Sequence, residues 1–215
     1  MVQKTKKPRG IKLETVAPKR RGRPRAYEPE VALGKALGLF RKDGFAATSL
    51  DDLSAATGMN RPSLYAAFGD KRELYIKSYE RYRTDARAVM IEIFRGELPI
   101  RERLERIYAA ALDIYLGDAS EPKGCFTVMT AASEAVADPE IRALVLDGFA
   151  DLDTAFASCF RRAKEKGELP SSADPVVLAQ LASATIHTIA IRSRARVARK
   201  ELEAIAKGAI GVMCR

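Results

Sequence analysis

The chain has 215 residues with 37 Lys or Arg against 28 Asp or Glu, and hydrophobic residues make up 47% of it without a single Trp. This length and composition predict one large or two small helical domains with an ample core. No apolar run approaches the roughly 20 residues that cross a membrane, and the charged N-terminus lacks the apolar segment of a secretory signal. We therefore expect a cytoplasmic protein without a membrane partner.

The cysteines and the histidine exclude most metal chemistry. Cys125, Cys159 and Cys214 are far apart and form no CxxC pair, and His187 is the one histidine. An odd number of scattered cysteines is typical of reduced thiols rather than of a disulfide framework or a metal site. We expect no metal and no cofactor.

The net charge of +9 comes from one end of the chain. Residues 1–27 contain ten Lys or Arg and one Glu, whereas the other 188 residues contain 27 bases and 27 acids. The composition predicts a disordered basic arm whose partner is an anionic polymer or surface. Within the arm, Arg21-Gly22-Arg23-Pro24-Arg25 resembles the core of an AT-hook, which places Arg21 and Arg23 in a narrow minor groove. A merely solubilising or electrostatic tail is the alternative.

The first helix is predicted over 29–43. Leu33, Ala36, Leu37 and Phe40 follow the i, i+3, i+4, i+7 spacing of a half-buried helix. This helix serves as scaffold for the segment that follows.

Two short helices are predicted between residues 48 and 69, each with marked ends. Thr48 with Asp51 suggests a capping box that opens a helix running to about residue 57. Gly58 then stands where a left-handed residue ends the helix, and Asn60 followed by Pro62 opens the next one.

A third boundary follows directly. Gly69 ends the second short helix, and Asp70 with Glu73 caps a long helix that starts at Lys71. A two-turn helix with so little apolar surface makes a poor scaffold but suits insertion into a major groove. The pattern predicts a helix-turn-helix.

Residues 29–80 resemble the DNA-binding domain of the TetR family of transcriptional regulators. The features that carry the resemblance agree in register over the whole segment: Leu39-Phe40, Gly44-Phe45, Thr48, Gly58, Ser63-Leu64-Tyr65, Phe68, Lys71 and Leu74. The remaining two thirds of the chain resembles the family only in its all-helical pattern. The resemblance implies a double-stranded DNA operator as partner.

Candidate DNA contacts lie at the start of the second short helix and at the flanking helix ends. A guanidinium donates two hydrogen bonds to guanine, so Arg61 is the first candidate for base readout, with Asn60 at the same helix start. A solvated surface arginine is the alternative for Arg61. Pro62 offers an apolar face to a thymine methyl, and Ser63 suits a base or a phosphate. Tyr65 suits a phosphate, with a place in the core as its alternative, and Thr48 and Lys71 are expected to anchor phosphates at helix N-termini.

The fold class expected is all-α with about nine helices. Its predicted parts are the arm (1–27), a helix-turn-helix domain (28–78) and a helical effector-binding and dimerisation domain (79–215). Beyond residue 70 the expected helices are 71–95, 100–116, 125–137, 139–166, 173–196 and 200–213.

The last two predicted helices are rich in Ala and β-branched residues, which permit close helix packing. A core within one protomer explains part of this pattern. The family resemblance implies a homodimer in which these helices pair with their copies, with Thr185, Ile189, Leu202 and Ile205 as candidate contacts.

A small-molecule effector pocket is also implied by the resemblance. Its candidate lining is aromatic, with one Met and one Cys: Tyr108, Tyr115, Cys125, Phe126, Met129, Phe149 and Phe156. Such residues at helical spacing also occur as ordinary core. A reactive role for Cys125 finds no second thiol nearby, and His187 fits a core or interface position.

These features together predict a DNA-binding transcriptional regulator, with repression released by an effector. An architectural DNA-binding protein that acts through the AT-hook-like arm is the alternative. The chain has no phosphate loop, no GxSxG elbow and no histidine-bearing metal motif, so an enzyme is not expected. The effector, the operator and the choice between repression and activation stay open.

Overall fold

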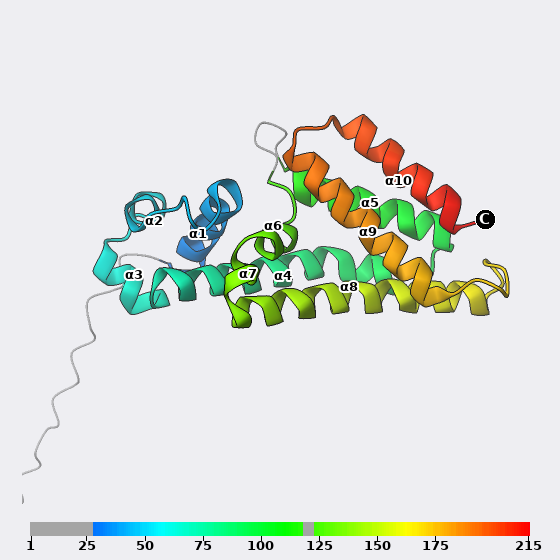
Figure 1. Cartoon of the computed structure of the whole chain (residues 1–215), viewed down its shortest axis with the longest axis horizontal. Coiled ribbons are helices and arrows are strands. Elements are labelled where there is room, and N and C mark those ends of the chain that lie inside the picture. Colours follow the sequence, from blue (N-terminus) through cyan, green and yellow to red (C-terminus); the bar gives the residue numbers. More distant parts are fainter. Residues whose placement is uncertain (1–27, 118–122) are drawn as a thin grey trace, which may run out of the picture.

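The computed structural model describes residues 28–117 and 123–215, which fold into α helices without any strand in those ranges (Figure 1). The arm, with the candidate contacts Arg21 and Arg23, lies outside the described residues. The helices are α1 (Pro29–Asp43), α2 (Leu50–Thr57), α3 (Arg61–Phe68), α4 (Lys71–Arg95), α5 (Ile100–Leu116), α6 (Phe126–Ala132), α7 (Glu134–Ala137), α8 (Pro139–Glu165), α9 (Pro175–Arg194) and α10 (Arg199–Met213).

The boundaries between the short helices follow local chemistry. Gly58 adopts the left-handed conformation at φ 73° and ψ 15°, as its place at the end of α2 predicts. The Asn60 side chain accepts a hydrogen bond from the amide of Ser63 at 2.9 Å and so caps α3. Asp70 and Glu73 form the predicted capping box of α4.

The capping box of α2 lies one residue later than predicted. Ser49, not Thr48, is the N-cap, and its hydroxyl accepts from the amide of Asp52 at 3.1 Å while the Asp52 carboxylate accepts from the Ser49 amide at 2.8 Å. Thr48 is instead buried, and its hydroxyl donates to the carbonyl of Gly44 at 2.6 Å. A hydroxyl followed three residues later by an acid occurs twice in this stretch, and burial of Thr48 selects the second pair.

Two of the longer helices also differ from the prediction. The helix predicted over 125–137 breaks at Ser133, where φ is −126° and ψ −91°. The break turns the carboxylate of Glu134 toward Tyr75, whose hydroxyl donates to it at 3.0 Å. The helix predicted to reach Arg196 ends at Arg194, because Arg196 has a left-handed φ of 63°.

The N-terminal head consists of α1, α2 and α3 packed on the first half of α4. Phe40, Leu53, Leu64 and Leu74 fill its interior and are at most 2% exposed. α4 continues without interruption from this head along the body (Figure 1). One rigid helix therefore belongs to both the head and the body.

The body is a layered helical bundle in which α8 runs along α4 and packs against α9, and α10 covers α9 and α5 (Figure 1). Fully buried side chains from several helices meet in its core, among them Leu104, Ile107, Phe156, Phe160 and Ile189. Leu202 of α10 is also fully buried. Because Ile189 and Leu202 have no surface left to bury, the prediction that they contact a partner subunit is wrong.

Among the described residues one helix, α9, is long and apolar enough to cross a membrane by length and composition alone. The sequence-based expectation that no segment comes near this limit is therefore corrected. Part of the apolar character of α9 is explained by packing, since Ala179, Ala182, Ile186 and Ile189 are buried in the core.

Candidate nucleic-acid interface and cavity

The α3 helix has one face in the core of the head and one face in solvent. Leu64 and Phe68 are at most 5% exposed and hold the helix against the head. Arg61 and Pro62 are exposed at its first turn, and Tyr65 is 48% exposed. The alternative placement of Tyr65 in the core is thus excluded, and α3 presents a polar outer face that starts at its N-terminus.

Arg61 is paired with a carboxylate of the preceding helix. Its Nη2 lies 2.7 Å from both Asp51 oxygens, and its Nε lies 3.0 Å from Oδ1. The hydrogen bonds to Asp51 raise the pKa of Arg61 above its ordinary value. Both side chains are more than half exposed, at 54% and 74%, so this pair contributes little stability and can open at small cost.

The predicted phosphate anchors differ in availability. The Thr48 side chain is 1% exposed and its proton is donated to Gly44, so in this conformation its hydroxyl cannot donate to a phosphate. Lys71 starts α4, with its ammonium 4.3 Å from the ring centre of Phe45. Sequence reasoning missed Lys77, whose Nζ donates to the carbonyl of Phe68 at 2.7 Å and ties the end of α3 to α4.

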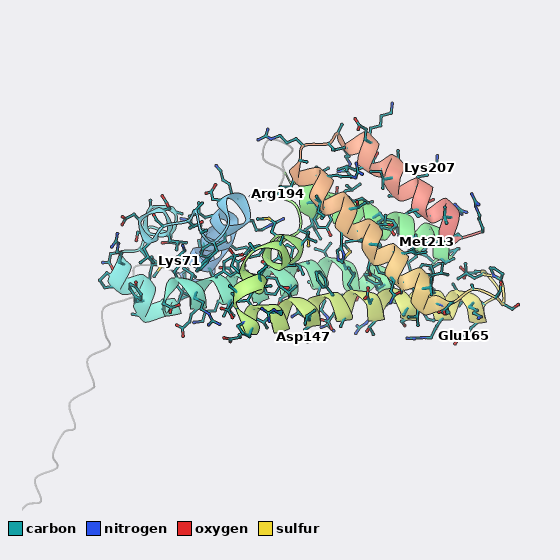
Figure 2. The ribbon with its side chains drawn as sticks, in the orientation of Figure 1. Lys71, Asp147, Glu165, Arg194, Lys207 and Met213 are labelled. Atoms are coloured by element: carbon teal, nitrogen blue, oxygen red, sulfur yellow. The ribbon has the colours of Figure 1, made fainter. Side chains whose placement is uncertain are left out.

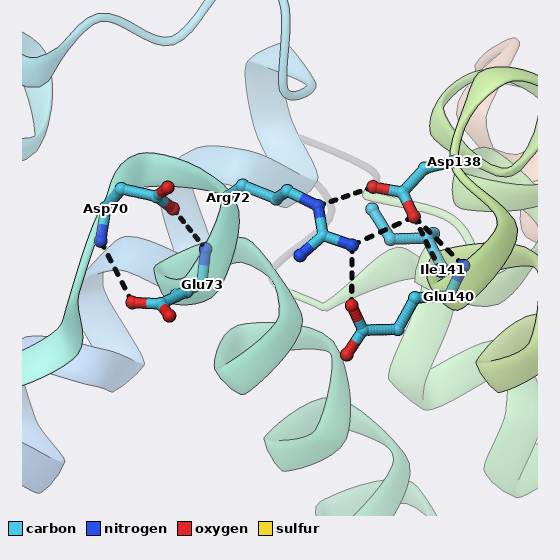
Figure 3. Close-up of polar contacts among 6 residues, drawn as sticks. All are labelled: Asp70, Arg72, Glu73, Asp138, Glu140 and Ile141. Carbon is cyan, nitrogen blue, oxygen red and sulfur yellow. Dashed lines mark hydrogen bonds and ion pairs between the residues drawn. The ribbon is translucent and has the colours of Figure 1, made fainter.

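An ion-pair cluster joins the first turn of α4 to the start of α8 (Figure 3). Arg72 donates through Nε to Asp138 at 2.5 Å and through Nη2 to Glu140 at 2.6 Å. Asp138 also caps α8 through the amides of Glu140 and Ile141. The Arg72 guanidinium lowers the pKa of Asp138 to about 2. The cluster fixes α4 against α8 at the end nearest the head.

Arg41, from the last turn of α1, reaches into the body. Its Nη2 donates to the carbonyls of Ile114 at 3.0 Å and Gly124 at 2.9 Å, and its guanidinium carbon lies 5.0 Å from the ring centre of Tyr82. In return, Arg194 at the end of α9 nearest the head (Figure 2) donates to the carbonyls of Arg41 at 2.8 Å and Lys42 at 3.0 Å. Nothing in the local sequence pattern distinguishes these two arginines from ordinary basic residues at helix ends.

Beside this junction lies a cavity of about 800 Å³ bordered by α4, α5 and α8. Its apolar wall includes Met90, Phe94 and Ile107, and α8 contributes the small side chains of Ala155 and Ser158. Its volume is within the range of ligand pockets in proteins, about 300–1,000 Å³.

The end of the cavity nearest the junction is formed by Tyr82, Ile114, Tyr115 and Cys125. The Tyr82 hydroxyl donates to the sulfur of Cys125 at 3.4 Å. Burial raises the pKa values of Tyr82 and Tyr115 well above the ordinary value, so both phenols keep their protons. Tyr82 and Ile114 contact Arg41 and also line the cavity, so the cavity and the head–body junction share a wall.

Of the predicted pocket residues, the structure places Tyr115 and Cys125 on the cavity and the other five elsewhere. Tyr108, Phe126 and Phe156 are at most 1% exposed and belong to the core. Phe149 packs on His187 with ring centres 4.9 Å apart, and neither it nor Met129 lines the cavity. The aromatic pattern therefore marked the core. The cavity that the structure contains is lined mainly by α8 and by the half of α4 beyond the head, whose apolar positions continue past the residues that the head needs.

Two segments of the chain match models of known protein families. Residues 32–77 match the model of the bacterial regulatory proteins of the tetR family, and residues 101–209 match a tetracyclin repressor-like C-terminal domain. The HTH-type transcriptional repressor ComR of Escherichia coli is 30% identical over 190 residues, which cover 87% of this chain and 90% of ComR.

The chain belongs to the TetR family of DNA-binding transcriptional regulators. The HTH-type transcriptional repressor BdcR of Escherichia coli is 32% identical over 133 residues, which cover 62% of this chain and 66% of BdcR. A cysteine mutant of the TetR family regulator CifR, complexed with a 26-base-pair operator DNA, has a TM-score of 0.79 at 26% identity. The match covers 88% of this chain and 98% of CifR. The helix-turn-helix predicted from residues 48–71 is thus confirmed as part of a TetR-type head.

We predict that Arg61→Ala costs about 1–3 kcal/mol of operator affinity and relaxes the preference at one base pair per half-site, since Arg61 is expected to leave Asp51 for a guanine. Lys71→Ala should lower the affinity for all operator variants by the same factor. Asp51→Asn keeps the shape but removes a negative charge near the DNA, and should tighten binding to every sequence. Binding to a set of single-base operator variants checks this. If Arg61→Ala lowered the affinity for every operator variant equally, Arg61 would be assigned to a phosphate contact instead of a base.

Proposed function

We propose that this regulator is a homodimeric cytoplasmic repressor that leaves a palindromic operator when a small molecule fills the cavity beside α4. The observation that carries the proposal is the wall shared by the cavity and the head–body junction. A ligand that displaces Tyr82 or Ile114 must disturb the contacts that hold Arg41. The repressor names of ComR and BdcR and the operator complex of CifR support the DNA-binding part.

Release follows from the place of α4 in both parts of the molecule. α4 supplies Met90 and Phe94 to the cavity, and through Lys77 and Leu74 it supports α3. A ligand that favours a tilted α4 would shift the population toward heads in a different position. The two recognition helices of the dimer would then no longer match successive major grooves about 34–36 Å apart.

The dimer is proposed to form through the outer face of α9 and α10. Val177, Leu181 and Ile191 recur at helical spacing along α9 and are 50%, 48% and 57% exposed, and Val212 of α10 is 59% exposed. A shallow apolar hollow between the two helices includes Leu181, Thr185 and Val212. Clustered exposed apolar side chains of this kind mark interaction surfaces. Thr185 and the partly buried Ile205 stay candidate contacts.

We predict that Leu181→Asp yields folded monomers, because an unpaired charge in the interface costs about 3–5 kcal/mol. Lys207→Asp, at an exposed position of α10 outside this face, is the control and should leave the dimer intact. Ile189→Asp should instead unfold the protomer, since Ile189 is fully buried. Sedimentation with circular dichroism separates these cases. An unchanged Leu181→Asp dimer would contradict the interface.

The architectural alternative relies on the basic arm, which carries the whole excess charge. Deleting residues 1–25 should weaken operator binding at low salt and flatten its salt dependence by about 0.9 in log–log slope for each lost phosphate contact. Sequence preference should survive, because the outer face of α3 is untouched. Titrations of both proteins against operator and scrambled DNA at several salt concentrations test this. Loss of operator discrimination in a folded, dimeric truncated protein would favour the architectural function.

A further inference from the structure

We infer that the ligand of the cavity beside α4 is an amphipathic anion, an apolar body with one acidic head. This inference rests on the proposed function, because it names the chemical class of the ligand that acts at the same cavity. The charges along the cavity and its apolar wall support this class of ligand.

Basic side chains exceed acidic ones on the described cavity lining. Arg83, Arg87, Arg95 and Arg162 stand against Glu80 and Asp151. One pair cancels, since Nη2 of Arg83 lies 2.7 Å from Asp151. After this pair is set aside, the lining carries three positive charges and one negative charge, that of Glu80. Among the lining residues of α4, Glu80 lies nearest the head.

Two of these three arginines are exposed at the mouth of the cavity, and the third is partly buried. Arg87 and Arg95 lie two turns apart on α4, and neither forms a hydrogen bond or ion pair with any residue that the structure describes. Arg162 of α8 donates through Nη2 to the carbonyl of Phe94, while its Nε is buried without a partner among the described residues. A buried donor left unpaired costs free energy, and a shift of the Arg162 side chain that lets Nε donate to an anion in the cavity would recover that cost.

The wall beside these cations is apolar. Met90, Ile91 and Phe94 of α4 line the cavity together with Leu152 and Ala155 of α8. A purely polar anion would make no use of this apolar wall, and a neutral apolar ligand would gain nothing from the excess positive charge of the lining. A carboxylate or a comparable single anionic group on an apolar body satisfies both, with a bidentate pairing that guanidinium favours.

Calorimetry with the full-length dimer and three matched ten-carbon probes tests the inference: decanoate, methyl decanoate and decyltrimethylammonium. Decanoate should bind at least about tenfold more tightly than the neutral ester, as expected for one charge-assisted hydrogen bond. The cation should bind more weakly than the ester. Equal affinities of decanoate and the ester, a preference for the cation, or no binding of any probe would overturn the anionic class.

Variants locate the head group. Arg87→Gln and Arg162→Gln should each lower the decanoate affinity about tenfold and leave the ester affinity unchanged. Arg161→Gln changes the neighbouring exposed arginine, which does not line the cavity, and should change neither affinity. Because Arg162 also holds the end of α4, Arg87→Gln keeps the test valid if Arg162→Gln misfolds. Equal losses for decanoate and the ester in Arg87→Gln would overturn the assignment.

Adding decanoate to a preformed operator complex separates this inference from the proposed function. Selective binding of decanoate together with release of the DNA supports both. Selective binding without release would leave the ligand class standing and contradict ligand-released repression.

Discussion

Beside the cavity, the DNA-binding head is held to the body by an arginine that crosses from one to the other. Arg41 leaves the last turn of α1, donates to two backbone carbonyls of the body and lies over the ring of Tyr82. Its Nε is buried and has no partner among the residues that the structure describes, so this part of the guanidinium is removed from water. Hydrogen bonds from a charged donor in such a place are worth more than surface ion pairs, about 1.5–3 kcal/mol each. Moving the head requires that they break.

The other contacts between the two parts act around this one. Arg194 holds the end of α1 from the opposite direction, and Arg72 holds α4 to the start of α8. The Arg72 cluster is partly exposed to water, which weakens it, whereas the Arg41 contacts lie against the wall of the cavity. A ligand of the kind proposed for the cavity would therefore act on the stronger contact. Under the proposed function, this arrangement would pass a small displacement in the body to α3.

Local chemistry made much of this fold predictable from the sequence. Gly58, Asn60, Pro62 and the Asp70–Glu73 box each specify a helix end through their own backbone needs, and all lie where predicted. The break at Ser133 was not predictable, because it serves a long-range hydrogen bond between Glu134 and Tyr75.

The sites followed the same division between local and long-range effects. Helical periodicity predicts which face of α3 lies in solvent. The exposed first turn with Arg61 and Pro62 lies where the sequence indicates. Which aromatic residues line the cavity depends on how α4, α5 and α8 are spaced, and periodicity cannot distinguish a buried Phe126 from a cavity-lining Phe94. The same holds for Ile189, which is apolar like Leu181 but faces inward.

The dependence of binding on the spacing between operator half-sites tests most directly whether the junction fixes the heads. Operators with one base pair inserted or removed at the centre are compared for the wild-type dimer, the Arg41→Gln/Arg194→Gln variant and an Arg161→Gln control. The wild type and the control should lose affinity steeply when the spacing changes, because rigid heads cannot follow the grooves. The junction variant should tolerate altered spacing while keeping its base preferences. An unchanged spacing dependence in a folded, dimeric junction variant would contradict the account.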